Sequence, residues 1–304
     1  MIRSGAAEEV PFREGDDTFA VTTPSRARRF GAVRLLWRRP VNALAAILVL
    51  CVVAAAFVGP IVAPYSPLAP QYGSAFAPPS PQHLFGTDNI GRDIFSRVLS
   101  GAQVALLVAV VVVGTAAVVG TTVGLVAGYM GGWIDELLMR LTDVFLALPV
   151  LVLAVAIAAT LGASIGHTIL ALTVLWWPWY ARLIRGQVLA LREREYVEAA
   201  RAVGVSPLRV MRRHLLPNTM APLLVQVSLD LGYAILAASS LSFIGLGVQE
   251  PAPDWGLMTA EAQPYIHSNW WVGVFPGLAI VLAVVGFNLL GDLVTDIQDP
   301  RRVR

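Results

Sequence analysis

The stretch "VALLVAVVVVGTAAVVG" (Val104–Gly120) has no charged residue and no alternation of apolar and polar positions. A lipid-facing β-strand requires that alternation, whereas a helix needs about 20 apolar residues to cross the ~30 Å core of a bilayer. Five further runs of this kind occur in the chain. The six predicted spans cover residues 41–63, 102–127, 144–161, 165–185, 219–242 and 270–291.

The overall composition also indicates a membrane protein. Of 304 residues, 56% are hydrophobic and 14% are charged, whereas soluble proteins usually carry about 25% charged residues. The forty residues before the first run include acidic ones, and that run is long enough to span, so we do not expect a cleaved signal peptide. The predicted fold class is an all-α polytopic membrane protein with six transmembrane helices.

The basic residues exclude two classes of enzyme. All 22 are arginines, so the chain lacks the lysine of a nucleotide-binding P-loop and the lysine that holds pyridoxal phosphate. The four histidines lie far apart, and Cys51 is the single cysteine, so no metal-ligand spacing occurs. We expect no catalytic residue, no metal and no cofactor in this chain.

The arginines also predict how the chain is oriented. Six spans place twenty of them on one side and only Arg92 and Arg97 on the other. The positive-inside rule assigns the rich side to the cytoplasm, so both termini are predicted to be cytoplasmic. Tryptophan and tyrosine are enriched at both membrane interfaces. On this basis we predict two interfacial groups: Trp176, Trp177, Trp179 and Tyr180 on the cytoplasmic side, and Trp270 and Trp271 on the outer side.

The segment "EYVEAARAVGVSPLRVMRRHLLPN" (Glu195–Asn218) is predicted to be an ordered cytoplasmic loop. Gly204 suits the left-handed residue that ends a helix, and Ser206-Pro207 suits the start of a second one. That second helix is expected to end before Pro217, with Asn218 as the cap of the next span.

An apolar stripe at helical spacing follows the first half of this segment: Tyr196, Ala199, Ala200 and Val203. Its small residues allow a close approach by another surface. The pattern alone fits either a protein partner or the surface of a lipid bilayer.

The same segment resembles the EAA loop of ABC importer permeases. Glu198-Ala199-Ala200, Gly204, Leu216 and Pro217 match the spacing of that motif, and His214 stands where the motif has an apolar residue. The resemblance implies a coupling helix, within residues 192–217, that sits in a cleft of a cytoplasmic ATPase subunit. The residues assigned to this coupling role are Tyr196, Glu198, Ala199, Ala200, Arg201, Gly204, Pro207, Leu216 and Pro217.

Three other stretches resemble the C-type subunit of dipeptide, oligopeptide and nickel permeases. They are "FGTDNIGRDIFSRVLSGAQVAL" (Phe85–Leu106), "LMRLTDVFLALPVLVLA" (Leu138–Ala154) and "LSFIGLGVQEPAPDWG" (Leu241–Gly256). The resemblance covers residues 34–302. It implies a basic tail (1–40), a first span with an outer segment (41–100), a permease core (101–300) and a short tail (301–304).

The resemblance also implies a complex in the bacterial plasma membrane. Its expected members are a B-type permease subunit, one or two ATPase subunits that hold ATP and Mg²⁺, and an external substrate-binding protein, with no nucleic acid partner. Peptides are the expected cargo, and nickel chelates, glutathione and haem are alternatives because sister systems share the scaffold.

Asp230 is the candidate for a polar site on the translocation path, together with Asp143 and Ser239. Many relatives carry an acidic residue where this chain has Ala237-Ala238-Ser239, and Asp230 lies about three turns earlier. A carboxylate inside a span often lines a polar path, but pairing with an arginine or contact with interfacial water would also explain it. A secondary transporter that uses Asp230 and Asp143 as proton sites is a distant alternative, as is a signalling subunit, for which the chain lacks an output domain.

Two further patterns concern packing. Asp93 and Arg97 are spaced to pair within an interfacial helix in the outer segment 85–101, which could receive the binding protein or cover helix ends. Gly120, Gly124 and Gly128 recur at every fourth residue, which allows close helix packing. Packing within the chain is the favoured use of these glycines, and contact with a second permease is the alternative.

Overall fold

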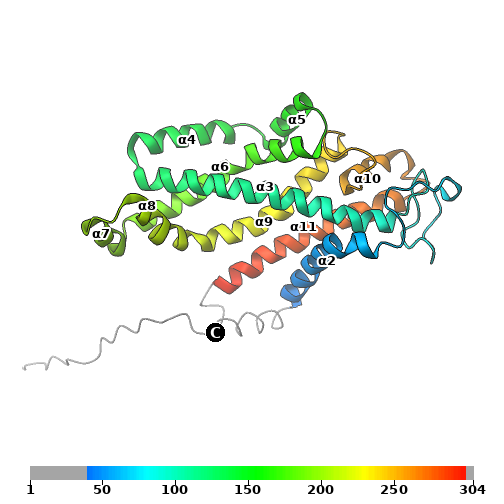
Figure 1. The fold of residues 1–304 in the computed structure, drawn as a ribbon, viewed down its shortest axis with the longest axis horizontal. Helices are drawn as coiled ribbons and strands as arrows, with labels where there is room; N and C mark the ends of the chain where they lie inside the picture. Colours follow the sequence, from blue (N-terminus) through cyan, green and yellow to red (C-terminus); the bar gives the residue numbers. More distant parts are fainter. Residues whose placement is uncertain (1–39, 299–304) are drawn as a thin grey trace, which may run out of the picture.

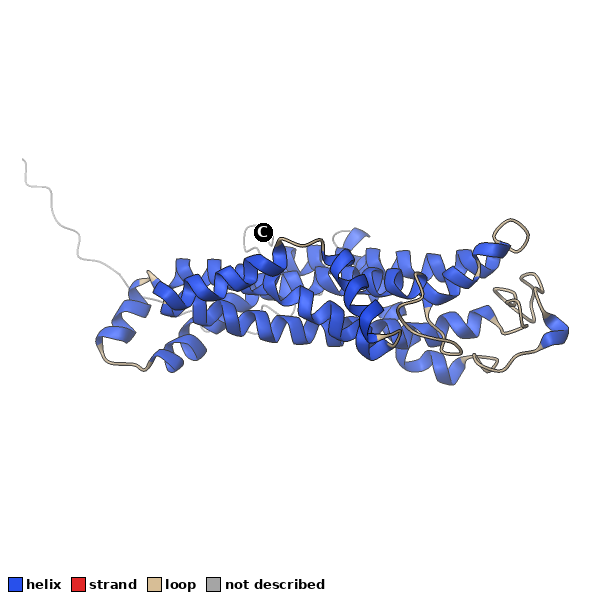
Figure 2. Ribbon diagram, turned by 90° about the horizontal axis from the view of Figure 1, so that it is seen from above, coloured by secondary structure: helices blue, strands red, loops and turns tan. Residues whose placement is uncertain are grey.

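The computed structural model describes residues 40–298, and within this range the ordered elements are helices. Of the predicted tails, 1–40 and 301–304, residues 1–39 and 301–304 lie outside the described residues, and Pro40 begins a helix. The α-helices form an elongated bundle (Figures 1 and 2). They are α2 (Pro40–Val62), α3 (Ile94–Met130), α4 (Gly132–Leu146), α5 (Val150–Leu161), α6 (Ile165–Arg192), α7 (Glu195–Ala202), α8 (Pro207–Val210), α9 (Leu216–Phe243), α10 (Trp255–Glu261) and α11 (Trp271–Gln298).

Four helices in the described part are long and apolar enough to cross a membrane. They are α2, α3, the helix from Pro207 to Phe243, and α11; α4 and α5 together would make a fifth. Helix α6 covers the predicted span 165–185 and extends seven residues beyond it. Its tryptophans, Pro178 and its arginines reduce its hydropathy below that of the other spans.

The predicted span 144–161 is wrong as a single straight helix. Helices α4 and α5 meet at an angle of 82°, and Pro149 stands at the N-cap of α5 in an extended conformation. Proline removes a backbone donor, and it disfavours helical geometry in the residue before it. Most of α4 occupies residues that were expected to form a loop between spans.

Helix α3 packs closely along α6, as Figure 1 shows. A Cβ atom at Gly120 would lie 2.3 Å from the carbonyl oxygen of Trp177, and one at Gly124 would lie 2.5 Å from that of Ala181. At Gly128 it would lie 2.9 Å from the side chain of Val188. The prediction that this glycine repeat packs within the chain is confirmed.

We predict that Gly120→Ala destabilises the protein, because the added methyl group meets backbone atoms of α6 that have no room to move. Overpacking of this kind costs about 1–3 kcal/mol. Gly114 lies on the same helix with no atom near its Cβ position, so Gly114→Ala should be neutral or slightly stabilising. Thermal unfolding of both purified variants measures the difference, and equal midpoints would contradict the prediction.

Candidate functional site

Helix α7, which carries the Glu-Ala-Ala motif, ends in a tight left-handed cap. Gly204 has φ +79°, as its sequence position predicts. Its N–H donates to the Arg201 carbonyl, and the N–H of Val205 donates to the Ala200 carbonyl at 3.0 Å. This pair of bonds is the Schellman motif, which satisfies the last carbonyls of the helix.

The second helix of the segment does not end before Pro217, contrary to the prediction. Helix α8 continues through a π-helical turn (Met211–Leu215) directly into α9. A proline in a helix lacks its N–H and crowds the preceding turn, and the wider π turn accommodates Pro217 at the start of α9. Asn218 lies inside α9 and donates to the His214 carbonyl at 2.6 Å, so it is not a cap.

The predicted apolar stripe of α7 is divided between two faces. Ala200 is buried, together with Val197, against the rest of the chain. Tyr196, Ala199 and Val203 are exposed, and Val203 is 79% accessible. The exposed set leaves an apolar surface free at the end of the bundle, beside the exposed Glu198 of the motif.

Two arginines connect this end of the bundle to α3. The guanidinium of Arg201 lies over the ring of Tyr129, 4.8 Å from its centroid, in cation–π geometry. Arg192 donates to the Gly128 carbonyl at 3.2 Å. A hollow of about 550 Å³ adjoins the segment and is lined by Ser206, Leu208, Arg209, Arg212, Arg213 and Pro217.

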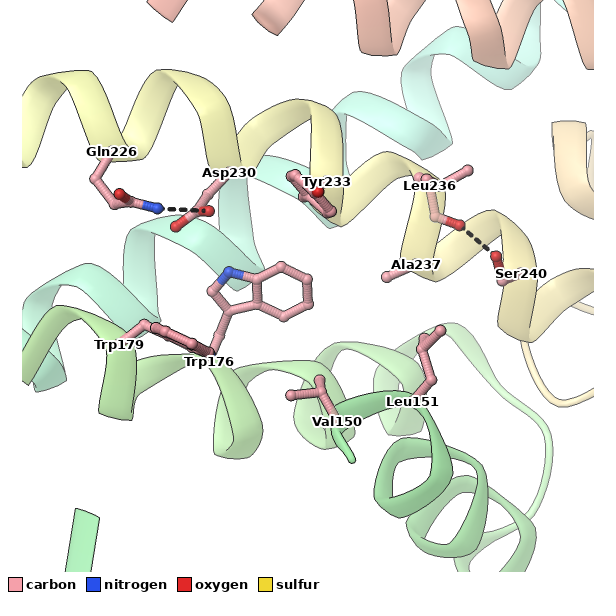
Figure 3. A pocket seen from close by; sticks show the side chains of 10 residues that line it. All are labelled: Val150, Leu151, Trp176, Trp179, Gln226, Asp230, Tyr233, Leu236, Ala237 and Ser240. Atoms are coloured by element: carbon pink, nitrogen blue, oxygen red, sulfur yellow. Dashed lines mark hydrogen bonds between the residues drawn. The ribbon is translucent and has the colours of Figure 1, made fainter. Parts of the chain in front are cut away.

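A cavity of about 530 Å³ lies between α5, α6 and α9 (Figure 3). This volume falls within the range of small-ligand pockets. Helix α9 contributes residues at intervals of three or four, which form one face of a helix. The lining residues are Val150, Leu151, Trp176, Trp179, Gln226, Asp230, Tyr233, Leu236, Ala237 and Ser240.

Asp230 is the charged residue of this lining. It is only 6% exposed, and its Oδ1 accepts a hydrogen bond of 3.0 Å from Nε2 of Gln226. Tyr180 and Trp176 border the same carboxyl group. Its Oδ2 is buried and has no hydrogen-bond partner of normal geometry among the described residues.

Of the three predicted path residues, the structure places only Asp230 in the cavity. Asp143 lies on the exposed face of α4 and accepts a bond of 2.5 Å from Arg182. Ser239 is buried, and its backbone faces Gly256. Its neighbour Ser240 lines the cavity instead.

Sequence reasoning missed the aromatic wall of this cavity. Trp176 and Trp179 lie near the middle of α6 and line the cavity with Tyr233. Trp176 is buried, so its predicted position in an interfacial belt is wrong, whereas Trp179 is 53% exposed. The polar residues of α9 at positions 226, 230, 233 and 240 share one helical face. That pattern in the sequence would have identified Gln226 and Ser240.

Sequence comparison assigns the family. Residues 120–304 match the family described as "binding-protein-dependent transport system inner membrane component". The chain belongs to this family. It is therefore a multi-pass membrane permease component of an ABC transporter and not itself an enzyme.

Close relatives cover most of the permease. It is 42% identical to the probable D,D-dipeptide transport system permease protein DdpC of Escherichia coli (strain K12), over 94% of this chain and 97% of that protein. It is 46% identical to the dipeptide transport system permease protein DppC of Alkalihalophilus pseudofirmus, over 73% of each chain. The glutathione transport system permease protein GsiD of Escherichia coli O6:K15:H31 is 45% identical over 73% of this chain and 74% of its own.

The fold also matches a solved transporter. A chain of the inward-facing MetNI methionine ABC transporter superposes with a TM-score of 0.55 at 22% identity. The match covers 68% of the permease and 98% of that chain. At this identity the likeness concerns the fold, which is that of an ABC importer permease.

The outer segment of the permease is held by a buried charge network. Arg92 and Arg97 are 2% and 1% exposed. Nε of Arg92 bonds Asp88 at 2.5 Å, and its Nη2 lies 3.3 Å from Glu250 and 3.4 Å from Glu261. Arg97 lies 3.8 Å from Asp88 and 3.7 Å from Glu261. The network thus joins the segment before α3 to the loop after α9 and to α10.

The predicted pairing of Asp93 with Arg97 is wrong. Asp93 caps α3, because its Oδ2 accepts bonds from the backbone N–H and the hydroxyl of Ser96. Its Oδ1 bonds His83 at 2.9 Å. The residues expected to form a separate interfacial helix are the capped first turns of α3, which runs on to Met130.

Two tryptophan side chains form hydrogen bonds with the backbone of the same region, residues 85–101. Nε1 of Trp255 donates to the Val98 carbonyl at 2.9 Å, and Nε1 of Trp271 donates to the Thr87 carbonyl at 3.3 Å. Trp271 is buried, so its predicted position in an interfacial belt is wrong, whereas Trp270 is 50% exposed. The two outer sequence blocks, 85–106 and 241–256, therefore pack against each other.

This network makes stability depend on pH. Burial raises the pKa of Glu261 to about 7, and a hydrogen bond with Glu250 acts in the same direction. That bond lowers the pKa of Glu250 in turn. Because an unfolded glutamic acid titrates near 4.5, the folded state retains a proton that the unfolded state releases. Stability therefore decreases as the pH rises from about 4.5 to about 7.

We predict that the thermal unfolding midpoint of the purified permease decreases as the pH is raised from about 5 to about 8. The decrease should correspond to a loss of about 1–2 kcal/mol in the free energy of unfolding. Glu261→Gln cannot ionise and keeps a hydrogen-bond donor, so it should flatten this dependence. Thermal unfolding of both proteins across the range measures it. The same slope in the variant would contradict the assignment to Glu261.

Proposed function

We propose that this permease is the C-type membrane subunit of an ATP-driven importer of di- and oligopeptides. The observation that carries the proposal is the 42% identity to a D,D-dipeptide permease over 94% of this chain and 97% of that protein. Similarity over nearly the whole length includes the cavity and the coupling segment, rather than the membrane scaffold alone.

In the proposed topology the chain crosses the membrane six times, with both termini in the cytoplasm. Helix α6 supplies a span in addition to the four or five candidates identified by length and hydropathy. The arginine distribution supports this orientation, because it places Arg209, Arg212 and Arg213 on the cytoplasmic side with α7.

The proposed partners are a B-type permease, one or two ATPases with ATP and Mg²⁺, and an external binding protein, in a bacterial plasma membrane. The exposed apolar face of α7 and the arginine-lined hollow beside it are suited to contact with an ATPase surface. Arg209, Arg212 and Arg213 make no ion pair with a described residue, so their charges are available to an acidic partner. In this arrangement, closure of the ATPases moves α7 and α9.

In this proposal, the cavity between α5, α6 and α9 forms the part of the translocation route that this chain contributes. Asp230 lies on its wall. The second permease would complete the route. Glutathione is the second candidate cargo, because the permease is 45% identical to GsiD. Membership of a binding-protein-dependent family disfavours the secondary-transporter and signalling alternatives.

The coupling role is tested at Gly204. We predict that Gly204→Val lowers peptide uptake by the reconstituted complex about tenfold, because a β-branched residue is strained at φ +79° and the cap of α7 is distorted. No atom lies within 4 Å of the added Cβ position, so the effect comes from the backbone. Uptake of alanylalanine by proteoliposomes, together with ATP hydrolysis, measures the loss.

Gly204→Asn is the matched control, because asparagine also adds a side chain but tolerates the left-handed conformation. It should retain most of the uptake. Co-purification of the ATPase subunits with each variant separates a loss of docking from a loss of transmission. Normal uptake by Gly204→Val would contradict the coupling role of this cap.

A further inference from the structure

The charge on the cavity wall is unbalanced. Of the side chains that line the cavity, only Asp230 is a carboxylate and none is basic. Its described polar neighbours, Gln226, Tyr180 and Trp176, are neutral, and Oδ2 makes no hydrogen bond of normal geometry with the described residues. Burying a carboxylate is costly unless a cation or several hydrogen bonds compensate for the lost water.

Two acidic side chains of α4 are paired with arginines of α6. Asp135 accepts two bonds from Arg185, at 2.5 and 2.7 Å, and Asp143 accepts one from Arg182. Helix α6 therefore supplies arginines to the carboxylates on α4, but none to Asp230. Asp230 is part of the cavity lining, so a cation in the cavity would lie against this carboxyl group.

The walls around Asp230 also suit a cation. Trp176, Trp179 and Tyr233 line the cavity together with the carboxylate (Figure 3). Tryptophan and tyrosine rings attract ammonium groups through their π faces. The remaining lining residues, among them Val150, Leu151 and Leu236, are apolar and are suited to a hydrocarbon group attached to the cation.

We propose that this cavity is a binding site for the protonated primary amine of a transported compound. The ammonium group pairs with Asp230, and the adjoining apolar part packs against the aromatic wall. The inference rests on the proposed function in one respect, that the cavity lies on the route of the cargo. The proposed site restricts the cargo to compounds with a free ammonium group. It excludes compounds whose only charged groups are anionic.

The test measures the charge of the cavity directly. In the complete complex, Cys51→Ala removes the single cysteine of this chain and Ser240→Cys places a thiol on the cavity wall. Modification at position 240 by aminoethyl, sulfonatoethyl and methyl methanethiosulfonate, which are a cation, an anion and a neutral reagent, is followed by mass spectrometry of this chain.

The expected result is a preference for the cationic over the anionic reagent that Asp230→Asn reduces about tenfold. Position 240 lies about 15 Å from Asp230 along α9, and the one charge attracts one reagent and repels the other, so both effects add in the ratio. The neutral reagent should react equally in both backgrounds. Asp292→Asn is the matched control, because it removes an exposed carboxylate from α11, which contributes nothing to the cavity lining. It should leave the preference unchanged.

Binding itself is measured by protection. n-Octylammonium, whose chain extends along the cavity from Asp230 toward position 240, should slow the reaction of the neutral reagent there. n-Octanol should not, and Asp230→Asn should abolish the difference. Equal protection by the two probes would overturn the proposal. So would an unchanged reagent preference in Asp230→Asn, or a thiol that the neutral reagent does not reach.

Peptide uptake is measured separately with alanylalanine in proteoliposomes. Uptake without ammonium protection would refute the amine site and leave the importer proposal intact. Ammonium protection in a complex that transports no peptide would support the amine site and refute the proposal of a peptide importer.

Discussion

The contact between α3 and α6 determines where the cavity and the proposed coupling segment of the permease lie. Three glycines on α3 bring its backbone against the carbonyl groups of α6. With one side of α6 held in this way, Trp176 and Trp179 are directed to the cavity, and its C-terminal end leads into α7. A relative shift of the two helices would force backbone atoms together. The pair is therefore expected to move as one rigid unit.

Helix α9 connects the two regions that this unit positions. The helix from Pro207 to Phe243 is interrupted only by a π-helical turn. Arg212, beside the coupling segment, and Asp230, on the cavity wall, are 18 residues apart, or about 27 Å along a helix. Because a helix resists compression, a displacement at the coupling end is transmitted along its length. The π turn is the place where α9 can change direction relative to α7.

Much of this arrangement was predictable because it depends on local chemistry. Gly204 takes the left-handed conformation that its place after a short helix predicts, and the glycine repeat forms the close contact that its spacing predicts. Segment 144–161 was misread because hydropathy counts apolar residues and does not register the break that Pro149 introduces.

The remaining errors concern an irregular helical turn and contacts between residues that are apart in the sequence. Pro217 was read as a helix end, although a π turn accommodates it. Trp176 and Trp271 were assigned to interfacial belts, because sequence does not reveal that another helix or loop covers them. Asp93 was paired with Arg97 from their spacing alone, whereas His83 and the cap of α3 engage it.

Buried charge is compensated differently at the start of α3 and at the cavity, and this contrast gives Asp230 its significance. At the start of α3, the buried Arg92 and Arg97 lie within ion-pair distance of Asp88, Glu250 and Glu261, so these buried charges are opposed by charges of the same chain. Removing one member of such a cluster leaves the others unpaired, which costs stability. At Asp230 the described residues provide an amide and aromatic groups but no cation. Buried Asp88 is paired with an arginine and Asp254 serves as the cap of α10, whereas Asp230 does neither, so its compensation is expected to come from outside the described residues.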